Sequence, residues 1–247
     1  MDKALFIAMS GAKQTMLAQQ AHANNLANVK TTGFKEDFTQ ARSMPVYGEH
    51  YPTRAYAMTE RPATNFDAGP LMQTGNNLDI AIKGDGWMAV QDENGAEAYT
   101  RAGDLSIDIN GQLRTGKGLP VLGNGGPIVL PPSAKIEIGA DGTISVLPLG
   151  SDAVGLAQVD RIRLVNPDAA DLEKNEDGLV HLKEGAAPPV LDATIQVEPG
   201  FLEGSNVNAV SALTDILSLS RQYELQVKLM SQADQISQST ARLFQFS

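Results

Sequence analysis

The fold is decided near the carboxyl end, where the sequence reads Ala209-Val210-Ser211-Ala212-Leu213-Thr214-Asp215-Ile216-Leu217-Ser218-Leu219-Ser220-Arg221-Gln222-Tyr223. No Pro or Gly occurs between Gly204 and the last residue, so nothing in the sequence interrupts a long helix. At a rise of about 1.5 Å per residue this helix would extend roughly 60 Å. Ser205 and Asn206 stand before it as the expected N-cap residues.

A second helix is predicted from Leu5 to Leu26, and it should end near Asn28 because Thr31-Thr32-Gly33 is poor helix material. In both helices apolar or small residues recur at alternating steps of three and four, which is the spacing of a coiled-coil seam. The predicted assembly residues on these stripes are Leu5, Met9, Ala12, Met16, Ala23 and Leu26 in the first helix and Leu213, Ile216, Tyr223, Val227 and Met230 in the second.

Two arrangements of these helices are compatible with the pattern. The helices could pair only with each other inside one chain, or both stripes could pack against neighbouring chains. We favour the second, because two paired helices leave most of a long apolar face exposed. Gln19, Ser220 and Asp234 also interrupt the stripes, and a weak seam with several alanines suits close packing of many helices.

Between the helices the sequence pattern predicts two further segments. Residues 31–75 carry four prolines and little periodicity, so we expect an extended, mostly irregular arm with short strands. Beyond the arm, apolar residues alternate along short runs that end in Gly84-Asp85-Gly86, Asn110-Gly111 and Asp141-Gly142, which are hairpin signals. This stretch predicts an antiparallel β-domain, barrel-like or sandwich-like.

The chain is therefore predicted to be an α+β protein with four parts: an N-terminal helix at 1–30, an arm at 31–75, a β-rich domain at 76–203 and a C-terminal helix at 204–247. The two helices together should form a coiled-coil-like domain.

Composition excludes several classes of protein. The 247 residues are 42% hydrophobic and include no cysteine, so a globular core is expected without disulfides or thiolate metal sites. No stretch approaches the roughly 20 apolar residues that span a bilayer, so we expect no membrane insertion. The net charge is −10, and residues 66–203 hold 21 acidic against 9 basic groups. Such an acidic middle argues against nucleic acid as a partner.

The amino-terminal segment is a poor match to a cleaved secretion signal. The apolar run from Ala4 to Met9 is short, Asp2 offsets the charge of Lys3, and the helical spacing continues past Ala12.

A search for reactive groups finds little. The three histidines, His22, His50 and His181, are scattered over helix, arm and β-domain, and His22 should face solvent or a neighbour. The glycine clusters lack the spacing of a phosphate loop. Ser106 to Lys117 resembles part of a calcium loop but has Ser first and Lys last, so a turn is expected there. We therefore expect no catalytic residue, no cofactor and no metal site.

Several stretches resemble the signatures of the flagellar rod and hook proteins. They occur in the family's order along nearly the whole chain: Asn24-Asn25-Leu26-Ala27-Asn28-Val29-Lys30-Thr31-Thr32-Gly33-Phe34-Lys35, Gly75-Asn76-Asn77-Leu78-Asp79-Ile80-Ala81-Ile82-Lys83-Gly84-Asp85-Gly86-Trp87, Tyr99-Thr100-Arg101-Ala102-Gly103, Gly118-Leu119-Pro120-Val121-Leu122-Gly123 and Leu202-Glu203-Gly204-Ser205-Asn206-Val207-Asn208. Within the family, the opening Met1-Asp2-Lys3-Ala4-Leu5 and Trp87 resemble the proximal-rod branch more than the distal-rod branch.

This resemblance implies a structural subunit of the flagellar basal body, with terminal helices forming the inner tube of the rod and the β-domain its outer layer. It further implies that the isolated ends are largely unfolded and become ordered on polymerisation. The implied partners are copies of the same chain, other rod subunits and the flagellar type III export apparatus. The implied location is the periplasmic rod, reached without a cleaved signal peptide. A distal-rod or hook-related protein is the nearer alternative, and a ligand- or carbohydrate-binding β-domain protein is the alternative from a different class.

Overall fold

The computed structural model describes residues 2–47, 54–60, 63–149, 155–175 and 177–245. It is an α+β protein with two helices and an antiparallel β region, as predicted. Contacts group the chain into two units. The helical unit comprises residues 1–28, 37–65 and 207–247, and the β unit comprises 29–36 and 66–206. The segment predicted as an arm therefore contributes to both units.

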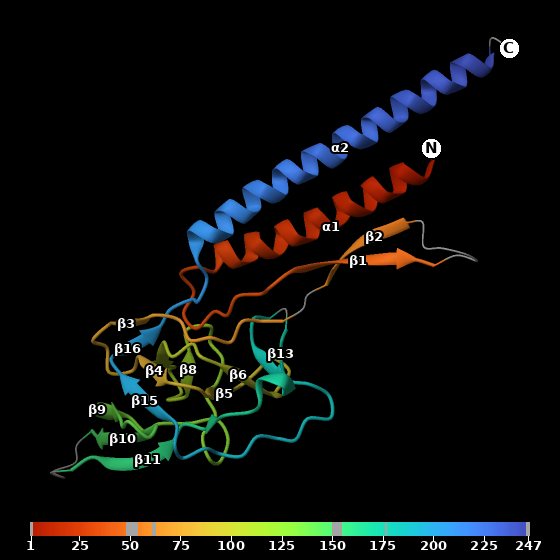
Figure 1. Cartoon of the computed structure of the whole chain (residues 1–247). Coiled ribbons are helices and arrows are strands. Elements are labelled where there is room, and N and C mark those ends of the chain that lie inside the picture. The colour runs from red at the N-terminus through yellow and green to blue at the C-terminus, as the bar shows by residue number, and fades with distance from the viewer. Residues whose placement is uncertain (1, 48–53, 61–62, 150–154, 176, 246–247) are drawn as a thin grey trace. The chain divides into compact units, whose positions relative to one another are not determined.

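Two long helices form most of the helical unit. α1 (Asp2–Ala27) and α2 (Ala209–Gln245) lie side by side and run antiparallel (Figure 1). Gln226 fixes their register, because its side chain lies against Gly11 and its Oε1 is 3.2 Å from Thr15 Oγ1. α1 ends where the sequence predicts, and α2 continues unbroken for 37 residues. Among the described residues, neither helix is sufficiently apolar along its length to cross a bilayer.

The start of α2 differs from the prediction. Asn208 is the N-cap, because its Oδ1 accepts hydrogen bonds from the amides of Val210 (3.0 Å) and Ser211 (3.2 Å). The predicted caps, Ser205 and Asn206, lie in the β unit, where Asn206 instead binds the chain near Glu36.

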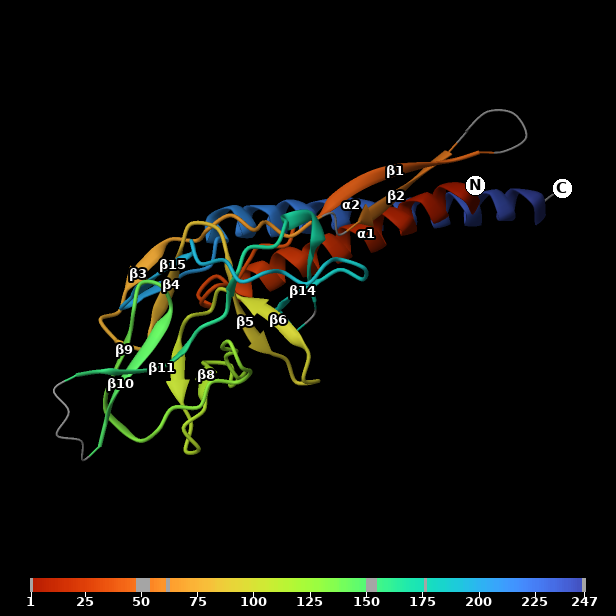
Figure 2. The same ribbon diagram turned by 90° about the horizontal axis from the view of Figure 1, so that it is seen from below.

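The helical unit also contains a hairpin of β1 (Gln40–Val46) and β2 (Arg54–Glu60), which Figure 2 shows beside α1. The Ser10 hydroxyl donates to the Ala57 carbonyl of β2 at 3.2 Å. Seven paired residues on each strand make this part of the predicted arm more regular than expected. Its described side chains are mostly exposed on both faces, so burial imposed no alternation that sequence analysis could detect.

The β unit is built from short strands joined by tight turns. Its elements are β3 (Leu71–Gln73), β4 (Ile80–Lys83), β5 (Trp87–Gln91), β6 (Glu97–Thr100), β7 (Leu105–Ile107), β8 (Leu113–Thr115), β9 (Ser133–Ile138), β10 (Thr143–Pro148), β11 (Ala157–Arg161), β12 (Leu164–Val165), a 3-10 turn (Ala169–Asp171), β13 (Leu172–Lys174), β14 (Val180–Leu182), β15 (Gln196–Pro199) and β16 (Phe201–Glu203). They form a five-stranded sheet (β12-β5-β6-β14-β13), a three-stranded sheet (β11-β10-β9) and the pairs β15-β4, β16-β3 and β7-β8.

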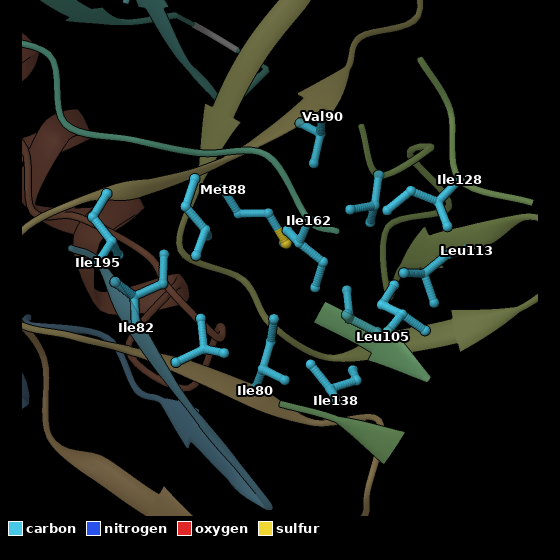
Figure 3. Packing of buried hydrophobic residues seen from close by; sticks show 14 of the residues in the cluster. Ile80, Ile82, Met88, Val90, Leu105, Leu113, Ile128, Ile138, Ile162 and Ile195 are labelled. Carbon is cyan, nitrogen blue, oxygen red and sulfur yellow. The ribbon is translucent and has the colours of Figure 1, made fainter. Parts of the chain in front are cut away.

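The five-stranded sheet is buried on both faces. Met88 and Val90 of β5 point into the main core, whereas Trp87 and Ala89 point into a smaller cluster on the opposite face. The main core also draws isoleucines and leucines from β4, β7, β8, β9 and β10, and Figure 3 shows this packing around Ile162. Burying both faces leaves the β unit with a core of its own.

Two of the three predicted hairpins are present. β7 pairs with β8 around Asn110-Gly111, and β9 pairs with β10 around Asp141-Gly142. The prediction of a hairpin at Gly84-Asp85-Gly86 was wrong, because β4 pairs with β15, while β5 pairs with β6 and β12. Glycines mark where a chain reverses, but they do not specify which strand becomes the partner.

Candidate functional site

The most strongly built polar site is a buried ion cluster of Lys35, Arg101 and Glu203 in the β unit. Glu203 has no exposed surface, and its carboxylate accepts from Lys35 Nζ at 2.6 Å and from Arg101 Nη1 at 3.0 Å. The backbone amide of Gly69 adds a third donor at 3.0 Å. A carboxylate out of water needs such a complete set of donors, since each missing one leaves charge uncompensated.

Both cations are also held by neighbouring groups. Arg101 donates through Nε to the Gly86 carbonyl (2.9 Å) and through Nη2 to the Gly84 carbonyl (2.8 Å), and it lies 5.3 Å from the Trp87 ring centre. Lys35 donates to the Asp67 carbonyl at 2.8 Å. Burial lowers the pKa of Lys35, and the hydrogen bond to Glu203 opposes that shift.

The ion cluster lies where two distant parts of the chain meet. The Gly33 amide donates to the Glu203 carbonyl at 2.8 Å, and the Asn206 amide donates to the Phe34 carbonyl at 3.3 Å. Asn206 Oδ1 in turn accepts from the Glu36 amide at 2.8 Å. The segment that follows α1 is thereby bound to the segment that precedes α2, inside one unit. We call this arrangement, residues 33–36 and 203–206 with Arg101, the junction.

Gly33 shows why the junction restricts sequence. Its φ is +65°, and a Cβ at this position would lie 2.4 Å from the Ala102 nitrogen. Lys174 covers the other side, with Nζ 2.6 Å from the Lys35 carbonyl and 3.8 Å from the centre of the Phe34 ring. The charged groups of Lys35, Arg101, Glu203 and Lys174 all bind other parts of the chain, so their arrangement serves to hold the structure together.

Other residues of the family-like motif bind locally in the helical unit. Asn25 is fully buried near the end of α1 and exchanges two hydrogen bonds with the backbone of Asp37: Nδ2 donates to its carbonyl (2.9 Å) and Oδ1 accepts from its amide (3.1 Å). Asn28 donates to the carbonyl of Asn24 one turn earlier, at 3.0 Å. Val207 is buried where the chain re-enters the helical unit.

The predicted assembly residues divide into two sets. Those at or near the contact between the helices are buried or half-buried, apart from Tyr223 at 39% exposure: Leu5, Ala12, Leu26, Ile216, Tyr223 and Met230. The others follow the contact residues Ala8, Thr15, His22, Ala212 and Gln226 by one position and are exposed: Met9, Met16, Ala23, Leu213 and Val227. Small and polar side chains such as Thr15 therefore share the helix contact with Ile216 and Met230, and the other apolar residues lie beside it.

The two histidines that the structure describes, His22 and His181, lie in different units. Contrary to expectation, His22 lies between the helices, with Nδ1 4.0 Å from Asp215 Oδ2 and Nε2 3.5 Å from Thr39 Oγ1. His181 lies 2.9 Å from Asp177 in the β unit, and His50 falls outside the described residues. Within the part of the chain that the structure describes, no three His, Asp or Glu side chains are grouped to hold a metal ion.

The segment that resembles a calcium loop is a turn. Asp108 Oδ1 accepts from the Asn110 amide at 2.6 Å, and Oδ2 accepts from Arg114 Nε at 3.2 Å. The hydrogen bond from Asn110 holds the pKa of Asp108 below its ordinary value. This carboxylate already has its partners within the hairpin.

A cleft of about 470 Å³ in the β unit is lined by Phe66, Asp85, Trp87 and Asp168, among others. It is the feature closest to a carbohydrate-binding groove. However, Trp87 is only 4% exposed, with Phe66 packed edge-on against it at 5.4 Å, so its ring faces are not free to stack on a sugar.

Comparison with known proteins places these features in a family. Three family models match: "Flagella basal body rod protein" at residues 5–35, "Flagellar hook protein FlgE/F/G D1 domain" at 81–146 and "Flagellar basal body rod FlgEFG protein C-terminal" at 198–243. The flagellar basal-body rod protein FlgF of Escherichia coli K12 is 41% identical over 239 residues, which cover 95% of each chain. The chain belongs to the FlgF family of flagellar basal-body rod proteins. FlgF of Salmonella typhimurium LT2 is 39% identical over 95% of each chain.

Membership of the FlgF family confirms the predicted resemblance and the prediction that the chain is not an enzyme. A flagellar basal-body rod protein with another name, FlgG of Buchnera aphidicola from Schizaphis graminum, is 31% identical over 98% of this chain, compared with 41% for the Escherichia coli FlgF. The first and third matched segments contain the two sides of the junction, Lys35 and Glu203. The matching motifs include Lys35, Arg101 and Glu203, but the sequence did not indicate that these three side chains meet.

Proposed function

We propose that this chain is a structural subunit of the proximal rod that polymerises through α1 and α2. The two helices form the coiled-coil-like inner domain of the rod tube, the hairpin at 40–60 belongs to an arm that contacts neighbours, and the β unit forms an outer layer. Family membership supports the rod assignment. The exposed apolar side chains of the helical unit support assembly through the two helices.

One observation carries the proposal: the helix pair leaves its largest apolar side chains uncovered. Met9, Met16 and Leu217 are 52%, 53% and 54% exposed, and Leu225 and Leu229 are 60% and 56% exposed. Covering a half-exposed side chain of this size contributes on the order of 1 kcal/mol before ordering costs. A pair of helices cannot cover these residues itself, so the stabilisation is available only from further chains.

The junction gives the proposed subunit a way to transmit force. Residues 33–36 and 203–206 are hydrogen-bonded to each other and share the buried carboxylate of Glu203. We infer that load from both helices enters the β unit at the junction. Torque could then pass through the folded chain without separating residues 33–36 from residues 203–206.

The proposed partners are copies of this chain and other rod subunits. Export through the flagellar type III apparatus, without a cleaved signal peptide, and a location in the periplasmic part of the rod complete the proposal. These statements rest on membership of the FlgF family.

Deletion of residues 209–247 tests the proposal at its broadest. We expect the remaining chain to keep a folded β unit, seen as buried Trp87 fluorescence, and to be absent from purified basal bodies. The sequence contains a single Trp, so this signal reports the β unit alone. Incorporation of the truncated chain would refute assembly through α2.

A point substitution gives a sharper test. Leu217→Asp places a charge on the exposed apolar surface of α2 and should reduce incorporation at least tenfold, with little effect on the isolated chain. Thr214→Asp, on the same helix and also exposed, is the matched control and should incorporate normally. Equal incorporation of both variants would contradict the proposal.

A further inference from the structure

Three asparagines of the β unit are each followed by a glycine, at Asn94-Gly95, Asn110-Gly111 and Asn124-Gly125. All three asparagines are exposed to solvent. An Asn-Gly pair is chemically labile, because glycine has no Cβ to shield its amide nitrogen, and this nitrogen can attack the neighbouring side-chain carboxamide. As dipeptides the three pairs are equivalent, so a difference in their reactivity must come from the fold.

Two of the three glycine amides are held in turns. The Gly95 amide donates to the Asp92 carbonyl at 3.1 Å, and the Gly111 amide donates to the Asp108 carbonyl at 3.0 Å. Gly111 is also bound through its own carbonyl, which accepts from the Leu130 amide at 2.8 Å. A nitrogen in such a turn must break its hydrogen bond before it can reach the asparagine side chain.

The third glycine, Gly125, is not held in this way. Among the described residues, the Gly125 amide donates to neither backbone nor side chain. The loop around it is closed by its neighbours instead, since the Gly123 amide donates to the Gly126 carbonyl at 2.7 Å. A Cβ on Gly125 would meet no atom within 4 Å beyond its chain neighbours. Asn124 and Gly125 therefore lie in open space with the attacking nitrogen available.

We propose that Asn124 is a site of spontaneous deamidation in the folded chain, whereas Asn94 and Asn110 are protected by their turns. The Gly125 nitrogen attacks Cγ of Asn124, a C–N bond forms, and ammonia leaves with the proton that the Gly125 amide gives up. Water then opens the resulting succinimide at either carbonyl and yields aspartate or isoaspartate. The reaction needs no enzyme, oxidant or reductant, and the inference does not depend on the proposed assembly of the rod.

Deamidation would place a new carboxylate beside an existing one. Asp160 Oδ1 accepts from the Asn124 amide at 3.4 Å and from the Arg161 amide at 2.7 Å. A second negative charge in this loop is repelled by the Asp160 carboxylate. The aspartate product should therefore bind less well to the loop around β11 than the asparagine does.

The isoaspartate product would also change the backbone, because its main chain runs through the former side-chain carbon and gains one methylene. The loop connects Val121 and Ile128, which are both fully buried in the main core. The Ile128 amide donates to the Val121 carbonyl at 3.0 Å, so the two ends of the loop are fixed. A longer loop between fixed ends should make the isoaspartate form less stable than the aspartate form.

Trypsin separates the three candidate sites. Cleavage after lysine and arginine places Asn94 in the peptide 84–101, Asn110 in 102–114 and Asn124 in 118–135, and each peptide contains a single asparagine. The purified full chain is incubated at mildly alkaline pH, and the deamidated fraction of each peptide is measured by mass spectrometry against an unincubated sample. We expect the peptide 118–135 to deamidate at least about fivefold faster than the other two, which is the rate effect of a hydrogen bond worth about 1 kcal/mol.

Two controls separate the fold from the local sequence. In the urea-unfolded chain all three glycine amides are free, so the three peptides should deamidate at similar rates. Gly125→Ala adds a Cβ beside the reacting nitrogen in open space, so it should slow deamidation at Asn124 and leave the Trp87 fluorescence of the folded chain unchanged. Equal rates in the three peptides of the folded chain would overturn the inference. So would an unreactive Asn124, an undiminished preference for Asn124 in urea, or a Gly125→Ala variant that reacts as fast as the unaltered chain.

Discussion

At the scale of single residues, the chain contains a carboxylate with no exposed surface, and removing this charged group from water costs free energy. Glu203 is the counter-charge shared by Lys35 and Arg101, and all three side chains are at most 3% exposed. Removing one partner from such a group leaves unpaired charge in a medium of low polarity, which costs far more than a surface ion pair contributes. The junction is accordingly sensitive to changes that preserve shape and alter charge.

Glu203→Gln keeps the shape of the side chain and removes its charge. We expect the β unit to lose about 3 kcal/mol or more of its free energy of unfolding, because two cations remain buried without a counter-charge. Urea unfolding followed by Trp87 fluorescence measures this loss. Glu173→Gln, on the exposed face of β13, is the matched control and should stay within about 0.5 kcal/mol of the unaltered chain. Equal stabilities for the two variants would show that the cluster contributes nothing.

Gly33→Ala separates steric conflict from backbone strain. Both Gly33 and Gly84 have positive φ, +65° and +81°, but only Gly33 has backbone atoms within reach of a Cβ. Gly84→Ala should cost about 1–2 kcal/mol, the price of a left-handed conformation, whereas Gly33→Ala should cost clearly more. Chemical denaturation of both variants makes the comparison, and a smaller loss at Gly33 would argue against close packing at the junction.

Acid should weaken the turn between β9 and β10. Hydrogen bonds from Thr143, first through its hydroxyl and then through its amide, lower the pKa of Asp141 below its ordinary value of 3.8. A carboxyl with a depressed folded-state pKa stabilises the fold above its unfolded pKa, and that contribution disappears as the pH falls through the folded value. Asp141→Ala should therefore be less stable than the unaltered chain at pH 7, with the difference shrinking below about pH 4. A difference in urea midpoint that stays constant from pH 7 to pH 2 would contradict this.

At the scale of secondary-structure elements, the start of α2 depends on one side chain. Asn208→Ala removes the acceptor for the amides of Val210 and Ser211 and should cost about 1 kcal/mol of helix stability. Circular dichroism at 222 nm, read during thermal unfolding, measures the loss. Thr214→Ala, whose hydroxyl binds only the Ser211 carbonyl one turn back, is the control. A thermal midpoint no lower for Asn208→Ala than for the control would assign the cap elsewhere.

Sequence periodicity located both helices because an unbroken apolar spacing over 22 or more residues is a strong signal. It located the line along which they touch only in part, at residues such as Ala12 and Ile216. The predicted stripe included Met9, Met16, Leu213 and Val227, yet the helices meet one residue earlier, at smaller or polar residues such as Thr15 and Gln226. Close approach of two helices needs small side chains, whereas a search for hydrophobic spacing selects large ones.

The β unit and the junction show the limit of sequence analysis more clearly. Local turn chemistry predicted the hairpins at Asn110-Gly111 and Asp141-Gly142, in which partner strands are adjacent. The pairing of β4 with β15 joins residues more than a hundred positions apart, and so does the ion pair between Lys35 and Glu203. Nothing local distinguishes these two charged residues from the many that lie in solvent.

At the scale of the whole molecule, the two units differ in how completely they bury their apolar side chains. The β unit buries both faces of its main sheet and closes its junction with internal charges. The helical unit keeps many large apolar side chains exposed, among them Phe6, Met16 and Leu217. We expect a subunit built in this way to gain most by ordering its helices in contact with other copies, because its β unit already has a core of its own.

The most direct test of this account is the accessibility of one engineered thiol on the helical unit. In a Leu217→Cys chain, which contains no other cysteine, maleimide labelling is measured on the purified chain and on intact basal bodies that contain it. We predict rapid labelling of the free chain and at least tenfold slower labelling in the basal body, because a neighbouring copy covers this position. Equal labelling rates in the two states would show that α2 is not covered on assembly and would contradict the account.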